Sequence, residues 1–446
     1  MQNKKLINES EISEALEAVS KDGIRLNSLR NLQHNKGIVL VAVKQNGHAL
    51  AYAGVDLRNN KQVVLAAVLQ NGFALQHAHL DFRKVYDVVL AAVKQNGCAL
   101  KFAGPHFQNG HNIVLTAVKQ NGWALEYASE ELRNDREFVL AAVSQNSYAL
   151  KYASTRLKKD KELVLAVVLK TGGALEFADV TLKKDHDIVL AAVKQNGNAL
   201  AYAHSTLMAD LEVVLVAVKQ DGNALEYASR SLRKDRAVVI AAVSQDANVL
   251  KDVEFGFHTD KEVTLAAVKQ DGLALLFVCD RFKHDQDVVL AAVSQNGLAL
   301  EYACSCKFGR HKEIVMSAVL RDGLALEYTS KGMKMNKDVV LAAVEKNGEA
   351  LEYASEELRG DPEIVLASMK EDLIACRYSL LGHEETKALL KEISLEKYVS
   401  PGELKGISVF DRIRKDDSII VREQNEQTLS KIISYFSLRD ASIFSK

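Results

Sequence analysis

The sequence predicts an all-α, right-handed superhelical solenoid of about fourteen repeats of 25 residues, each with two helices, and a cap at either end. Three observations predict this fold. Glycine recurs every 25 residues, an apolar run such as Val-Leu-Ala-Ala-Val precedes each glycine, and the 446 residues include only three prolines. One repeat of this length is too short to bury a core by itself, so neighbouring repeats must stack to enclose one.

The periodic glycine defines the register of the array. Glycine occupies it at Gly47, Gly72, Gly97, Gly122, Gly172, Gly197, Gly222, Gly272 and Gly297. Ser147 and Ala247 replace glycine in two copies. A single inserted residue between Ala303 and Ile314 shifts the later copies, which continue at Gly323 and Gly348.

The repeats fill residues 23–378, and residues 1–22 are expected to form an N-terminal cap. The copy at 247–257 lacks both the glycine and the tyrosine, so a bend or altered packing is expected there. Residues 379–446 leave the repeat and contain two amphipathic segments. We interpret this region as a helical cap on the last repeat, with a separate docking or secretion segment as the alternative.

The copy that starts at Asp185 illustrates the expected fold of one repeat. Asp185 suits the N-cap position because its carboxylate can accept free backbone amides, which predicts a first helix over about 186–195. Gly197 is expected to end this helix in the left-handed conformation. A second helix, partly a 3₁₀ turn, is predicted from Asn198 to Leu207. A strand, as in leucine-rich repeats, is disfavoured because the apolar run does not alternate with polar residues.

The consensus Asp-x-x-Val-Val-Leu-Ala-Ala-Val-x-Gln-Asn-Gly-x-Ala-Leu-x-Tyr-Ala resembles an uncharacterised tandem repeat family known as a domain of unknown function. That family occurs in bacterial proteins, including suspected secreted effectors, and in some protists. The pattern is also similar to the leucine-rich variant repeat, whose short helices stack into a superhelix. The resemblance covers about four fifths of the chain. It implies a solenoid and supplies neither an activity nor catalytic residues.

Positions that hardly vary between copies are interpreted as packing or turn positions. The Gln-Asn pairs, such as Gln95-Asn96 and Gln195-Asn196, are expected to satisfy backbone groups between repeats rather than to bind a ligand. The Tyr/Phe column, which includes Tyr202, is expected to lie in the core because it stands at helical spacing beside Leu and Ala.

The position after the turn glycine varies in blocks and is the best functional signal. Equivalent positions of a solenoid lie along one surface, so these residues would form an aromatic zone and a leucine zone that bind a partner. The candidate anchors are Phe73, Trp123, Tyr148, Leu273, Leu298 and Leu324. Packing of each residue on the next repeat is the alternative.

Charge and motifs argue against other classes of function. The formal net charge of −1 disfavours nucleic-acid binding, although lysines at the ends of the first helices could form a phosphate-binding stripe. No nucleophile, phosphate-loop or dinucleotide motif occurs, so a non-enzymatic protein without a cofactor is expected. An enzyme with its site in the C-terminal segment is the other alternative. Zinc binding by Cys279, Cys304 and Cys306 is disfavoured against an incidental cluster.

The N-terminus lacks the apolar core of a signal peptide, and no apolar run is long enough to cross a bilayer. A soluble, cytoplasmic monomer is therefore expected, with delivery into a host cytosol by a route without a signal peptide as an extension. The leading hypothesis is a protein-interaction scaffold that binds a protein or peptide, in the manner of a bacterial effector.

Overall fold

The computed structural model describes residues 9–382, 385, 388 and 389, apart from the side chains of residues 305, 306, 373 and 374. Within these residues the chain is helical and contains no strand. The chain divides into two compact units between Arg233 and Lys234. The expected C-terminal cap or docking segment at 379–446 lies almost entirely outside the described residues.

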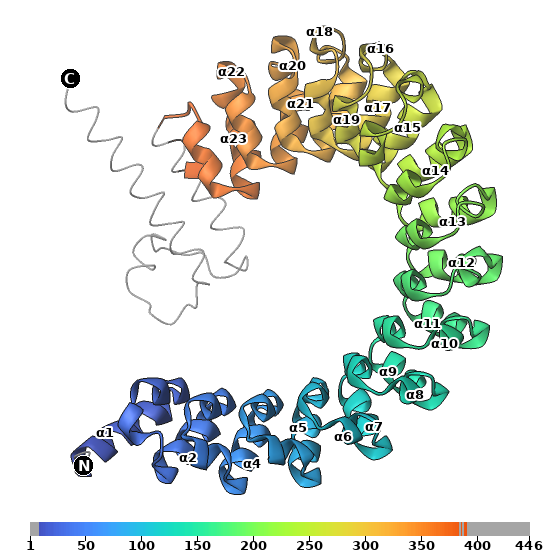
Figure 1. Ribbon diagram of the computed structural model, residues 1–446. Coiled ribbons are helices and arrows are strands. Elements are labelled where there is room, and N and C mark those ends of the chain that lie inside the picture. Colours follow the sequence, from blue (N-terminus) through green and yellow to red (C-terminus); the bar gives the residue numbers. More distant parts are fainter. Residues whose placement is uncertain (1–8, 383–384, 386–387, 390–446) are drawn as a thin grey trace, which may run out of the picture. The chain divides into compact units, whose positions relative to one another are not determined.

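In the first unit, ten-residue α-helices follow one another in chain order (Figure 1). Helix α1 (Glu9–Lys21) precedes them and packs against the first of them, burying Ala15 and Val19. The ten-residue helices are α2 (Lys36–Gln45), α4 (Lys61–Gln70), α5 (Tyr86–Gln95), α7 (His111–Gln120), α9 (Arg136–Gln145), α11 (Lys161–Lys170), α12 (His186–Gln195) and α13 (Leu211–Gln220).

A 3₁₀ helix accompanies each of these helices, and most repeats add a third, shorter helical turn. The 3₁₀ helices are η1 (Gly23–Ser28), η3 (Gly47–Tyr52), η4 (Gly72–His77), η6 (Gly97–Phe102), η7 (Gly122–Tyr127), η8 (Ser147–Tyr152), η9 (Gly172–Phe177), η11 (Gly197–Tyr202) and η12 (Gly222–Tyr227). The short turns are η2 (Arg30–Leu32), α3 (Val55–Arg58), η5 (Leu80–Lys84), α6 (Pro105–Gln108), α8 (Glu130–Arg133), α10 (Thr155–Lys158), η10 (Leu182–Lys184) and η13 (Leu232–Lys234).

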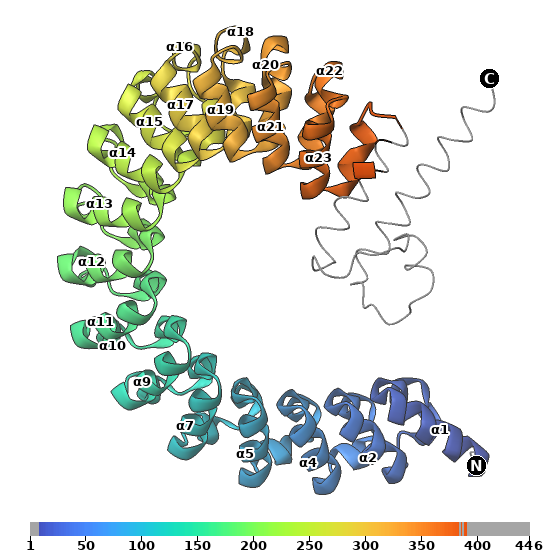
Figure 2. The ribbon, with the colours of Figure 1, turned by 180° about the vertical axis from the view of Figure 1, so that it is seen from behind.

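The second unit repeats the same three elements, as the reverse view also shows (Figure 2). Its ten-residue helices are α14 (Arg236–Gln245), α15 (Lys261–Gln270), α17 (Gln286–Gln295), α19 (Lys312–Arg321), α21 (Lys337–Lys346) and α23 (Pro362–Glu371). Its 3₁₀ helices are η14 (Ala247–Lys251), η16 (Gly272–Leu276), η17 (Gly297–Tyr302), η18 (Gly323–Tyr328), η19 (Gly348–Tyr353) and η20 (Leu373–Tyr378). Its short turns are η15 (Phe255–Thr259), α16 (Asp280–Lys283), α18 (Ser305–Phe308), α20 (Lys331–Lys334) and α22 (Glu356–Arg359).

The repeat therefore has three short elements where the sequence analysis expected two helices. The predicted first helix is confirmed, because α12 begins one residue after Asp185, whose Oδ1 accepts the amides of Asp187 and Ile188 at 3.1 and 3.2 Å. The predicted second helix is wrong in its extent. Its 3₁₀ portion ends at Tyr202, and Leu207 lies in the separate turn that follows.

The core lies between consecutive ten-residue helices. Ile188, Val189, Ala192 and Val193 of α12 are all fully buried, because α11 packs on one side of this helix and α13 on the other. The same four positions are buried in the other ten-residue helices. A helix that is apolar around most of its circumference can be stable only between two such neighbours.

The glycine that recurs every 25 residues has a different role from the one expected. It does not adopt the left-handed conformation; it is the first residue of the 3₁₀ helix, and the extended Asn or Asp before it ends the α-helix. Glycine is needed because a Cβ at Gly47 would lie only 2.5 Å from the carbonyl oxygen of Ala67 in the next repeat. The expected left-handed turn is therefore wrong, and close approach of two backbones takes its place.

A glutamine ladder joins successive repeats. The Gln70 Oε1 atom accepts the Gly47 amide at 2.6 Å, and its Nε2 donates to the Gln45 carbonyl at 3.2 Å. The same pair of bonds recurs at Gln45, Gln95, Gln120, Gln270 and Gln295. The structural interpretation of the Gln-Asn pairs is confirmed: these side chains satisfy backbone groups between repeats.

The two copies without glycine pack less regularly. At Ala247, in the copy where altered packing was expected, the amide-to-Gln270 distance is 3.2 Å, and the following turn leaves Phe255 79% exposed. At Ser147, α9 and α11 are in looser contact than the other consecutive ten-residue helices of the first unit. There Lys170 replaces the ladder glutamine and its Nζ donates to the Ser144 carbonyl at 2.6 Å.

Candidate functional site

The residue that follows the recurring glycine is the second residue of a 3₁₀ helix in each repeat. The amide of Trp123 donates to Asn121 Oδ1 at 3.0 Å, which caps the helix and fixes the start of the segment. Ala124 and Leu125, the next two residues, are buried. The side chain of Trp123 is half-buried at the edge of the repeat, so this position lies between core and surface.

Rings at this position pack edge-to-face on the Tyr/Phe column of the following repeat. Trp123 lies 5.8 Å from Tyr152, Phe73 lies 6.0 Å from Phe102, and His48 lies 5.9 Å from His77, all between ring centroids. Tyr148 lies 6.1 Å from Phe177, and its hydroxyl lies over Gly173, where a side chain would collide with it. This arrangement is the favoured geometry for aromatic pairs.

The Tyr/Phe column is therefore not in the core, contrary to the expectation from helical spacing. Its members are half-buried, and Tyr202 is 37% exposed. The reason is that the 3₁₀ helix turns Ala and Leu inward and leaves the ring on its outer edge. We call this surface of the first unit the aromatic strip. It comprises the paired rings His48 and His77, Phe73 and Phe102, Trp123 and Tyr152, and Tyr148 and Phe177. It also includes Cys98 and Tyr127, which occupy the equivalent positions in the repeat between the second and third pairs.

Charged side chains lie on the aromatic strip itself. The Lys101 Nζ atom is 5.9 Å from the centroids of both Phe102 and Tyr127, and Lys151 Nζ is 5.7 Å from that of Tyr152. Burial, followed by the nearby negative charge of Glu126, raises the pKa of Tyr127 and of Tyr152. Lys101, Glu126 and Lys151 are exposed, so they are available to a partner.

The three leucine candidates belong to the second unit. Leu273, Leu298 and Leu324 are half-buried at the same place in η16, η17 and η18. Two neighbours that the sequence analysis missed are more exposed, namely Leu276 at 45% and Phe277, which has Lys251 Nζ 4.2 Å from its ring centroid. The sequence could have indicated them, because leucine at position 276 replaces the Glu or Lys that most other repeats have there.

Phe73, Trp123 and Tyr148 thus share one surface of the first unit, whereas the leucines form a separate set in the second. All six residues are near enough to the core to pack on it and exposed enough to be contacted. Their role in partner binding stays a prediction.

Ion pairs between repeats were also missed by the sequence analysis. The basic residue at the start of a ten-residue helix contacts the capping Asp of the next repeat and the acid two residues later. Lys337 Nζ, for example, lies 2.8 Å from Asp361 and 2.7 Å from Glu363. Arg136, Lys161, Arg236 and Lys261 make both contacts. Lys61 and Lys312 contact only the later acid, which is Asp87 or Asp338. A Lys or Arg recurring 24 and 26 residues before acids was the available signal.

No group of three or more metal-ligating side chains comes together in the described part of the chain. Cys279 and Cys304 are half-buried, and the Cys306 side chain lies outside the described residues. His284 Nδ1 is 2.8 Å from the Asp280 carbonyl. That bond, with the neighbouring Cys304 thiol, raises the pKa of His284.

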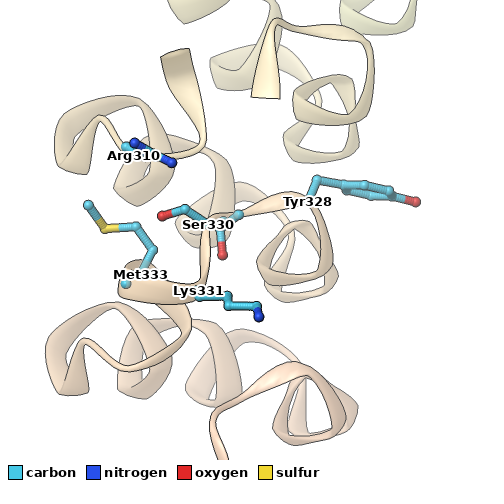
Figure 3. A pocket seen from close by; sticks show the side chains of 7 residues that line it. Arg310, Tyr328, Ser330, Lys331 and Met333 are labelled. Carbon is cyan, nitrogen blue, oxygen red and sulfur yellow. The ribbon is translucent and has the colours of Figure 1, made fainter. Parts of the chain in front are cut away.

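Two depressions lie in the surface of the second unit. One of about 750 Å³ is lined by Arg310 and by residues 328–333. Its labelled side chains do not converge, since Tyr328 points away from Arg310 and Met333 (Figure 3). A smaller one of about 340 Å³ lies beside the turn at Gly297.

The repeats match the family model of a domain of unknown function, DUF4116, over most of the described chain. The matched ranges are 15–58, 60–108, 112–158, 160–208, 210–255, 260–305, 311–359 and 336–379. The chain belongs to the DUF4116 family. Each DUF4116 match covers about two structural repeats, so the glycine-to-carbonyl approach and the glutamine ladder occur within a DUF4116 unit as well as between units.

No curated protein and no solved structure matches the chain. Among the residues that the structure describes, no helix is long and apolar enough to span a bilayer.

Proposed function

We propose that this DUF4116 protein is a non-enzymatic interaction scaffold that binds a protein or peptide along the aromatic strip, with Phe73, Trp123 and Tyr148 as anchors. The supporting observation is the series of half-exposed ring pairs on one surface of the first unit. Contiguous exposed aromatic residues are typical of partner-binding surfaces, and Trp and Tyr are frequent hot spots.

The leucine set at Leu273, Leu298 and Leu324 is a second contact region in this proposal. The neighbouring exposed Leu276 and Phe277 support it, because an apolar surface of this kind costs free energy while it faces water. The right-handed superhelix, the monomeric state and delivery into a host cytosol extend the proposal. They rest on the repeat pattern and on the family resemblance.

Affinity capture from bacterial and eukaryotic lysates, with and without nuclease, tests this function when variants are compared. The strip variant carries Trp123→Asn and Tyr148→Asn, since Asn198, Asn223 and Asn248 occupy the same position in later repeats. The control carries Leu69→Lys and Leu169→Lys. These leucines are 65% and 53% exposed at a helix-end position where lysine is the commonest residue.

We expect a nuclease-resistant partner that the control retains and the strip variant loses. Retention by both variants would overturn the strip as the site. Capture that disappears with nuclease would instead favour the exposed lysines at Lys44, Lys94, Lys119, Lys194 and Lys219, which form no ion pair within the described residues. Binding through them would weaken steeply with salt.

A further inference from the structure

We infer that the aromatic strip takes an extended proline-rich peptide in the polyproline II conformation, with an acidic, a basic and an acidic side chain at three-residue intervals. This inference rests on the proposed function and names the chemistry of its partner. The central contact region comprises the ring pairs Phe73–Phe102 and Trp123–Tyr152, with Lys101, Glu126 and Lys151 beside them.

Two other common modes of peptide recognition fit the strip less well. Strand addition needs a sheet edge, and the described residues contain no strand. Insertion of a peptide helix needs an apolar groove, and neither of the depressions described above lies on the strip. Surfaces lined by aromatic rings are the ones that bind polyproline II segments, because the rigid peptide loses little conformational entropy on binding.

The spacing of the rings also fits this conformation. Lys101, Glu126 and Lys151 lie in three successive repeats, and neighbouring packed helices lie about 8–10 Å apart. Three residues of polyproline II rise about 9.3 Å. A peptide with proline in every triplet would therefore place one triplet against each repeat, with the ring pairs Phe73–Phe102 and Trp123–Tyr152 at the two ends and Tyr127 between them. The looser junction at Ser147 interrupts this spacing after Lys151.

The charges on the strip then set the order of charges on the peptide. Lys101, Glu126 and Lys151 are exposed, occupy the same position in η6, η7 and η8, and alternate in sign. A complementary ligand has Glu, Lys and Glu at positions i, i+3 and i+6. This order reads the same in both directions, so it fits a chain running either way. The same alternation disfavours a polyanion such as single-stranded RNA, which would meet Glu126.

The probe is the synthetic peptide Pro-Pro-Glu-Pro-Pro-Lys-Pro-Pro-Glu-Pro-Pro, titrated against the full chain at low salt by fluorescence anisotropy. Matched peptides replace the three charged residues by three lysines or by three glutamines. A fourth peptide keeps the composition but sets the charges four residues apart. Oligouridine is the nucleic-acid comparison.

We expect the Glu-Lys-Glu peptide to bind more tightly than the others. The double variant Lys101→Glu with Lys151→Glu leaves only carboxylates at these positions, and it should reverse the preference toward the three-lysine peptide. Exposed ion pairs contribute about 0.2–1 kcal/mol each, so the change in relative affinity should be roughly fivefold to tenfold. High salt should reduce it. The control with Leu69→Lys and Leu169→Lys should keep the wild-type preference.

Equal affinity for all four peptides, or a preference that the double variant leaves unchanged, would overturn the inference. So would strip-dependent binding of oligouridine in place of the peptides. The proposed function is tested separately, by affinity capture. If the variant with Trp123→Asn and Tyr148→Asn loses the captured partner but the wild type binds none of the peptides, the scaffold function is correct and the polyproline ligand is wrong.

Discussion

Gly47 lies directly against the carbonyl oxygen of Ala67, which belongs to the next repeat. A Cβ atom at Gly47 would stand 2.5 Å from that oxygen and 2.9 Å from the Asn71 Cβ atom. The Gly47 amide points at the same neighbour and donates to Gln70 at 2.6 Å. One position thus provides both the close approach of two repeats and a hydrogen bond between them, and the bond is longer, at 3.2 Å, where Ala247 takes the place of glycine.

Gly47→Ala should therefore destabilise the first unit. Overpacking against a fixed backbone costs about 1–3 kcal/mol, and the lower melting temperature can be followed by circular dichroism. Gly256→Ala is the matched control, because nothing lies within 4 Å of a Cβ there. It should be neutral or slightly stabilising through the entropy of the unfolded chain. Equal effects of the two substitutions would contradict the role of close approach.

Gln70→Ala should remove two bonds between repeats and leave the buried Gly47 amide without its acceptor. A buried unsatisfied donor costs about 1–3 kcal/mol. Hydrogen exchange at the Gly47 amide should accelerate. Gln70→Lys should be milder, because a lysine can still donate to the Gln45 carbonyl. Lys170, at the equivalent position, donates to the Ser144 carbonyl in this way. An unchanged exchange rate in Gln70→Ala would show that the ladder contributes nothing to stability.

The ion pairs between repeats should make stability depend on pH in the acid range. A hydrogen bond from Lys337, reinforced by its charge, lowers the pKa of Asp361 from 3.8. Because the folded pKa lies below the unfolded one, the stabilisation is complete above the unfolded pKa and is lost as the pH falls through the folded value. The loss should occur below about pH 4.

Asp361→Asn tests this dependence without removing the helix cap, since Asn336 and Asn60 cap equivalent helices. At neutral pH the variant should be less stable by up to about 1 kcal/mol, because the pair is solvent-exposed. The difference in melting temperature from the wild type should disappear near pH 2. A difference that persists there would mean that the carboxylate charge is not responsible.

Trp123 is the only tryptophan in the chain, so its fluorescence reports on the aromatic strip alone. Tyr152→Ala removes its edge-to-face partner and should increase acrylamide quenching and shift the emission to longer wavelength. The lost ring contact should also cost about 0.5–1.5 kcal/mol beyond the area buried. Tyr202→Ala is the control. Tyr202 occupies the same position as Tyr152 in a later repeat, where Gly173 stands in place of Trp123, so this change should leave the emission unchanged. An unaltered spectrum in Tyr152→Ala would contradict the pairing.

The ten-residue helices could be predicted from sequence because their signals are local. Asp185 supplies the cap, the apolar run from Ile188 requires burial, and the Asn before Gly197 ends the helix, so the predicted range of about 186–195 is confirmed by α12. The reason for the glycine could not be predicted, because its constraint is the carbonyl oxygen of another repeat. A period of 25 residues shows that a position matters without showing which neighbour it meets.

The surface was predicted less well than the core. Helical spacing placed the Tyr/Phe column inside, but the segment from Gly197 to Tyr202 is 3₁₀, with about three residues per turn, and the ring position then turns outward. The post-glycine zones were found because they vary in blocks. Their ring partners, such as Tyr152 for Trp123, lie 29 residues away in the next repeat and follow only from the stacking.

From Gly47 to Gln120 each register glycine donates its amide to the Gln 23 residues later, and each of these Gln side chains donates to the carbonyl 25 residues earlier. Removing or duplicating a complete 25-residue unit within this stretch therefore preserves both kinds of bond where the ends rejoin. Unequal recombination within such a gene would produce folded chains in steps of one repeat. Copy number, and with it the length of the surface offered to a partner, is then a trait on which selection can act directly.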